Sequence, residues 1–128
     1  FERAHGTFTP QDTAWRRADG RYIDPFRPEI EPDGFDSPQA VEAARQEHLG
    51  AVRKLFAELD VLVFTLGLTE AWRAAGDGAV FPLCPMVVSG EIEPEDYEPV
   101  NFTHAEILED LTAFLAQLRT VNPGVKVL

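Results

Sequence analysis

A glycine and three side chains with different hydrogen-bonding properties follow an unbroken apolar run in the middle of the chain. The run Val61–Phe64 continues through Thr65 and Leu66, and the polar cluster after it contains Gly67, Thr69, Glu70 and Trp72. A glycine lets the backbone turn and bring an N–H close to a ligand, while a hydroxyl, a carboxylate and an indole N–H can each hold a different polar group. The sequence therefore predicts a binding or catalytic loop at residues 67–72. A structural turn followed by a capped element is the alternative.

The elements around this loop are typical of an α/β protein. A run without polar alternation is expected of a strand covered on both faces, as in parallel sheets, whose ligands bind beyond the carboxyl ends of the strands. We therefore expect a strand over Val61–Leu66. Residues 125–128 predict a second strand, and a helix between the two would make a right-handed βαβ unit with parallel strands.

Two helices have clear start signals. Ser37 can cap a helix that begins at Pro38, and apolar residues then recur at helical spacing to about residue 58. Thr103 and Glu106 form a capping box, with Phe102 placed for a hydrophobic staple on Ile107, and the Asn122–Gly124 turn ends that second helix. The sequence thus predicts an αβ(loop)αβ core over residues 38–128.

The remaining segments are rich in proline and glycine. Residues 1–37 predict an irregular segment that wraps a larger body, with a short strand near 21–23, and residues 73–99 predict a long loop with one short strand within 79–83. Asp24 and Arg27 lie in the first of these segments. They can bind a substrate carboxylate or phosphate through the guanidinium, or brace the loop as an ion pair. Trp72 can stack on a substrate or close the core.

Composition narrows the range of functions. With 22 acidic and 11 basic residues the formal charge is −11, which disfavours nucleic acid and anionic membranes as partners. Cys84 is the single cysteine, so no internal disulfide is possible, and no spacing typical of zinc ligands occurs. We expect no cofactor and no metal, and a cytoplasmic location. The chain starts with Phe1 and ends as a strand begins, so we expect a domain truncated at both ends.

Four motifs, in order, resemble the interior of the GSCFA-domain family, which is similar to the SGNH or GDSL-like hydrolases. They span nearly the whole chain and are residues 19–28 (DGRYIDPFRP), 65–72 (TLGLTEAW), 77–85 (DGAVFPLCP) and 118–123 (LRTVNP). The resemblance implies part of a three-layer α/β/α fold and an esterase or acyltransferase acting on a small ester or acyl substrate. A non-catalytic module that binds a small ligand or a peptide is the alternative.

The resemblance also implies roles for particular residues. The nucleophilic serine is expected upstream of Phe1 and the general-base histidine beyond Leu128, so an isolated 1–128 fragment should be inactive. Gly67-Leu-Thr-Glu70 stands where the superfamily has Gly-x-Asn-Asp, whose asparagine stabilises the oxyanion, with threonine for asparagine and glutamate for aspartate. Gly67, Thr69 and Glu70 are therefore the candidate oxyanion or orienting residues. Trp72, Asp24 and Arg27 are the candidate substrate-binding residues.

Overall fold

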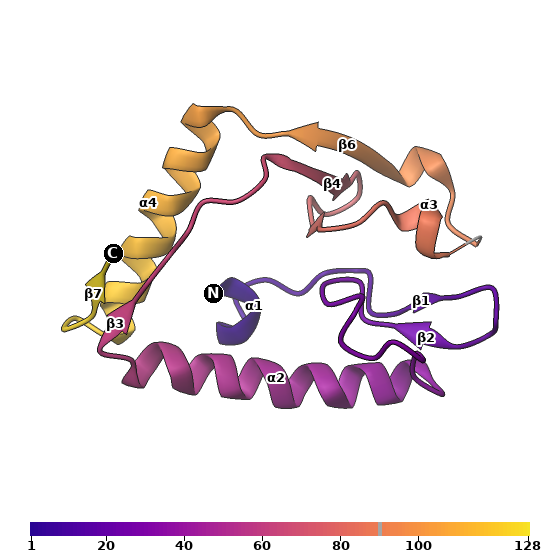
Figure 1. Ribbon diagram of the computed structural model, residues 1–128, viewed down its shortest axis with the longest axis horizontal. Coiled ribbons are helices and arrows are strands. Elements are labelled where there is room, and N and C mark those ends of the chain that lie inside the picture. Colours follow the sequence, from indigo (N-terminus) through magenta and orange to yellow (C-terminus); the bar gives the residue numbers. More distant parts are fainter. Residues whose placement is uncertain (90) are drawn as a thin grey trace. The chain divides into compact units, whose positions relative to one another are not determined.

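The computed structural model describes residues 1–89 and 91–128, which form two compact units (Figure 1). Unit 1 comprises Phe1–Thr9, Glu47–Leu68 and Phe102–Leu128, and unit 2 comprises Pro10–Gln46 and Thr69–Asn101. Helices and strands occur together and include a parallel strand pair, so the chain is an α/β protein, as the sequence predicts.

The first long helix, α2, runs from Pro38 to Glu58 and confirms the predicted span. Its start is fixed locally, because the Ser37 hydroxyl accepts a hydrogen bond from the Ala40 N–H at 3.2 Å. Val41 and Arg45 are its two buried residues. The buried face of α2 therefore carries a charged side chain as well as an apolar one.

The second long helix, α4, runs from His104 to Val121 and starts with the predicted capping box. The Glu106 N–H donates to the Thr103 hydroxyl, and the Glu106 carboxylate accepts the Thr103 N–H at 2.8 Å. The helix ends at Asn122, whose side-chain amide donates to the carbonyls of Phe56 and Leu59 at 3.2 and 2.8 Å. Asn122 thereby ties the end of α4 to the end of α2 within unit 1.

Removing the cap of α4 should destabilise unit 1 measurably. Thr103→Ala leaves the Glu106 N–H without its side-chain acceptor, so we expect the free energy of unfolding to fall by about 1 kcal/mol. Helix loss on urea denaturation, followed by circular dichroism, measures the change. Thr112→Ala makes the same chemical change in the middle of α4, where the hydroxyl only donates to the Leu108 carbonyl, and should not destabilise the helix. Equal losses in both variants would contradict the capping role.

The two strands of unit 1 are short. β3 (Val61–Leu62) pairs in parallel with β7 (Lys126–Val127), with Val61 opposite Lys126 and Leu62 opposite Val127. The parallel direction confirms the prediction, and α4 lies between the two strands in the chain order. A further bond from the Phe64 N–H to the Leu128 carbonyl extends the ladder.

The predicted strand over Val61–Leu66 is too long. Only its first two residues are in β3, and Val63, Leu66 and Leu68 are 69%, 63% and 93% exposed. Only Val61 and Leu62 stand opposite residues of β7, and beyond them the Phe64 N–H makes one further bond, to the Leu128 carbonyl. The expectation of burial on both faces is therefore also wrong for residues 63–66 in the described part of the chain.

Unit 2 contains a three-stranded antiparallel sheet where a long loop was predicted. Its strands are β4 (Glu70–Ala74), β5 (Val80–Phe81) and β6 (Tyr97–Asn101), in the order β5-β4-β6. β5 lies in the segment predicted for a short strand, whereas β4 starts inside the predicted loop 67–72, so that prediction is wrong from Glu70 onward. Short helices α3 (Pro85–Val88) and η1 (Pro94–Asp96) lie between β5 and β6.

The rest of unit 2 comes from the N-terminal third of the chain. β1 (Trp15–Arg16) and β2 (Tyr22–Ile23) form an antiparallel pair, of which only β2 was predicted. Phe81 is fully buried, with its ring 4.9 Å from both Trp15 and Phe26 and 5.9 Å from Tyr97, measured between centroids. These rings join the sheet to the segment that precedes α2 within one core.

Helix α1 (Glu2–His5) belongs to unit 1, where the Arg53 guanidinium donates to the Ala4 carbonyl at 2.8 Å. None of the helices in the described residues has the length and apolar character that crossing a bilayer requires.

Candidate functional site

Thr69 is joined to a residue of the neighbouring strand. Its hydroxyl donates to the side-chain carbonyl oxygen of Asn101 at 2.6 Å. The pairing of β4 with β6 makes this contact possible, because Glu70 stands directly opposite Asn101. The Asn101 carboxamide is thus oriented through its oxygen, and its nitrogen makes no hydrogen bond with the described residues. An exposed amide N–H donor held in this way can bind an oxygen of a ligand.

One face of the sheet carries the side chains around this pair. Residues alternate between faces along a strand, and directly opposed residues of antiparallel strands point to the same face. Glu70 and Trp72 therefore share a face with Asn101 and Pro99, which stand opposite them on β6. Glu70 is exposed and makes no ion pair with a described residue, while Trp72 is half-buried. The Glu70 carboxylate and the Asn101 amide are exposed at this end of the face, whereas Trp72 stands opposite the fully buried Phe81.

Gly67 does not have the geometry that the sequence predicted for it. Nothing lies within 4 Å of the position a Cβ atom would take, and its φ is outside the left-handed region. A close approach of its N–H to a ligand is therefore not built into this backbone. Gly67 belongs to unit 1, whereas Thr69 and Glu70 belong to unit 2.

Asp24 and Arg27 form the ion pair that was one of their two predicted roles. The Arg27 Nε donates to Asp24 Oδ2 at 3.0 Å, and the fully buried Asp24 side chain also accepts from Arg45 Nη2 at 2.7 Å. The Phe26 N–H donates to Asp24 Oδ1 at 3.1 Å, and Arg45 Nη2 donates to the Thr13 carbonyl at 2.6 Å. We call Asp24, Arg27 and Arg45 the Asp24 network.

Charge pairing within the Asp24 network overcomes the cost of burial. Burial alone would raise the pKa of Asp24, but the hydrogen bonds and charges of Arg45 and Arg27, with the Phe26 N–H, hold the pKa below its ordinary value. The carboxylate is therefore ionised at neutral pH. Arg45 was missed in the sequence, although its position four residues after Val41 places it on the buried face of α2.

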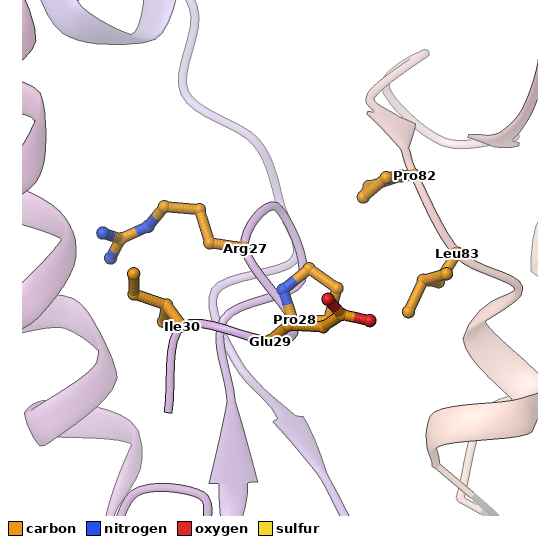
Figure 2. A pocket seen from close by; sticks show the side chains of 6 residues that line it. All are labelled: Arg27, Pro28, Glu29, Ile30, Pro82 and Leu83. Atoms are coloured by element: carbon orange, nitrogen blue, oxygen red, sulfur yellow. The ribbon is translucent and has the colours of Figure 1, made fainter. Parts of the chain in front are cut away.

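A pocket of about 500 Å³ lies beside this network (Figure 2). In Figure 2, Arg27 and Ile30 lie at one end of the pocket, Pro82 and Leu83 at the other, and Pro28 and Glu29 between them. Most of this lining is apolar. We call it the Arg27 pocket.

The structure places the predicted site residues in separate locations. Thr69, Glu70 and Trp72 lie at β4, whereas Asp24 and Arg27 lie in the loop between β2 and α2. No hydrogen bond or ion pair joins the two groups among the described residues. In the described ranges no three His, Cys, Asp or Glu side chains are placed to hold a metal ion.

Comparison with known proteins gives one family. The GSCFA family profile matches residues 2–128, which is almost the whole chain. Searches of curated proteins and of solved structures give no match.

Proposed function

Because the chain belongs to the GSCFA family, we propose that it forms part of an SGNH-like serine esterase or acyltransferase with a three-layer α/β/α fold. The observation that carries this proposal is the hydrogen bond between Thr69 and Asn101 beside Glu70. It holds the amide of Asn101 beside Thr69 and Glu70, the residues that stand where the SGNH superfamily has the Asn and Asp of its Gly-x-Asn-Asp block. The parallel pair of β3 and β7 supports the fold.

In the proposed reaction, a serine outside residues 1–128 attacks the carbonyl carbon of an ester while a histidine, also outside this segment, takes the serine proton. The carbonyl electron pair moves onto oxygen and creates an oxyanion. The Asn101 Nδ2–H donates to this oxyanion, and the Thr69 hydroxyl fixes the amide by donating to its oxygen. The asparagine missing after Gly67 is thus supplied by the neighbouring strand. Collapse of the intermediate expels the alcohol and leaves an acyl-serine for water or another acceptor.

The other candidate residues have supporting roles in this proposal. Glu70 lies opposite Asn101 and orients an arginine or histidine of the complete site. Trp72 shares the face with Glu70 and stacks on the substrate through the exposed part of its ring. Gly67 gives the connection to β4 conformational freedom, and nothing lies within 4 Å of the position its Cβ atom would take.

The experiment is a set of variants in a full-length gene product that contains residues 1–128. Removing one oxyanion donor typically lowers the turnover rate by about 100-fold to 1000-fold, so Asn101→Ala should lower kcat on short acyl esters by that factor with little change in KM. Thr69→Ala should reduce kcat less, because the amide donor remains and only its orientation is lost. Glu98→Ala alters an exposed residue of the same strand and serves as the matched control.

Two results would contradict the mechanism in different ways. Unchanged turnover in Asn101→Ala would remove Asn101 and Thr69 from the oxyanion site. Turnover by residues 1–128 alone would contradict a nucleophile located outside this segment.

The Arg27 pocket favours a second candidate function, a binding module without catalysis. A pocket lined mainly by apolar groups and one guanidinium can hold a small ligand without any nucleophile. A phosphonate ester that labels serine nucleophiles separates the two functions, since labelling of the full-length protein supports the enzyme and its complete absence supports the binding module.

A further inference from the structure

The Arg27 guanidinium has an unused hydrogen-bond donor in the interior. Its Nε donates to Asp24, but Nη2 is buried and has no acceptor among the described residues. The side chain as a whole is 17% exposed. A buried N–H of a permanently charged group that lacks an acceptor is unfavourable, so this position favours an oxygen from a ligand.

Asp24 accepts three hydrogen bonds from the described residues, and none of them comes from Arg27 Nη2. Its Oδ1 already accepts from Arg45 and from the Phe26 N–H, and its Oδ2 accepts from Arg27 Nε. Both carboxylate oxygens are in use, and the network holds them in place from two sides. Arg27 Nη2 is therefore left without an acceptor in the described ranges, although the carboxylate lies at hydrogen-bond distance from Nε of the same guanidinium.

The surroundings of Arg27 indicate the kind of ligand. Pro28, Ile30, Pro82 and Leu83 supply apolar surface in the Arg27 pocket, and the single acidic side chain in its lining, Glu29, lies between the two ends (Figure 2). A charged head beside Arg27 and an apolar body along the prolines would use both parts of this lining. A second negative group on the ligand would be repelled by the Glu29 carboxylate.

We propose that the Arg27 pocket binds a small monocarboxylate with an apolar body. The ligand carboxylate accepts hydrogen bonds from the Arg27 guanidinium, and the body packs against Pro28, Ile30, Pro82 and Leu83. A singly charged head fits better than a doubly charged phosphate because the negative Glu29 side chain lines the same pocket. This site does not depend on the proposed esterase activity.

Titration calorimetry of residues 1–128 with hexanoate and with hexanamide tests the proposal. The two probes match in size and differ in charge, so hexanoate should bind at least about tenfold more tightly, as expected for a charge-assisted hydrogen bond. Adipate, which adds a second carboxylate, should bind more weakly than hexanoate, and Glu29→Gln should reduce that difference. Equal affinity for hexanoate and hexanamide would overturn the proposal, as would a lack of saturable hexanoate binding up to about 20 mM.

A substitution at the head end locates the site. Ile30 is 56% exposed, so its replacement should not disturb folding. Ile30→Glu puts a carboxylate beside the proposed ligand head and should weaken hexanoate binding at least about tenfold, while the matched Ile30→Gln should change it less than about threefold. Equal hexanoate affinity in the two variants would place the ligand elsewhere and overturn the assignment.

Discussion

Asp24→Asn should lower the free energy of unfolding of unit 2 by about 3 to 5 kcal/mol at pH 7, because removing one partner of a buried ion pair leaves the other charge uncompensated. Two arginines depend on this carboxylate, and Arg45 has a side chain only 5% exposed. The asparagine keeps the shape but loses the charge. Trp15 and Trp72, the only two tryptophans, both lie in unit 2, so their fluorescence during urea denaturation reports on this unit.

The same residue makes the stability depend on pH in a defined direction. The pKa of Asp24 is lower in the folded protein than in the unfolded chain, where an aspartate has a pKa of about 3.9. Its contribution is therefore fully present above the unfolded pKa and is lost as pH falls through the folded pKa. The difference in stability between wild type and Asp24→Asn should be constant from about pH 6 to 8 and shrink below about pH 4.

Asp36→Asn is the matched control for this prediction. Asp36 also pairs with an arginine, Arg21, but its side chain is 85% exposed. Exposed ion pairs contribute about 0 to 1 kcal/mol, so the same change there should have a small effect. A similar loss in both variants would show that burial of the Asp24 network is not the source of its stability.

Phe81→Ala should destabilise unit 2 by about 3 to 5 kcal/mol, the cost of removing a buried aromatic side chain. Phe81 is fully buried and contacts the rings of Trp15, Phe26 and Tyr97. The substitution would therefore leave a cavity between the three-stranded sheet and the segment that precedes α2. Denaturation followed by tryptophan fluorescence measures the loss.

The adjacent residue provides the control for Phe81. Val80 lies in the same strand but is 41% exposed, and Val80→Ala should cost less than about 1 kcal/mol. A loss below about 1 kcal/mol in Phe81→Ala as well would contradict the central place of this ring in the core.

The helices could be predicted from sequence because their signals are local. Ser37 and Thr103 act on N–H groups within three residues, so neighbouring residues are sufficient to locate each start. The parallel direction of β3 and β7 followed from the helix between them. These parts required no knowledge of distant contacts.

The antiparallel sheet of unit 2 was not predicted from the sequence, and one reason is a proline in β6. Pro99 in β6 argued for a loop, since proline cannot donate to a strand partner, but β6 is an edge strand in which one side needs no partner. Pairing of Glu70 with Asn101 is a distant contact, and so the Thr69–Asn101 bond had no local signal. Arg45 was overlooked for a different reason, because a charged residue in a helix is usually exposed.

The interleaving of the two units has a consequence for protein synthesis. β3 pairs with β7, and all of the second segment of unit 2, followed by α4, must be translated between them. At about 5 to 20 residues per second, the ribosome takes on the order of several seconds to supply that partner. Throughout this interval Val61 and Leu62 of the nascent chain lack the strand with which they pair in the folded unit.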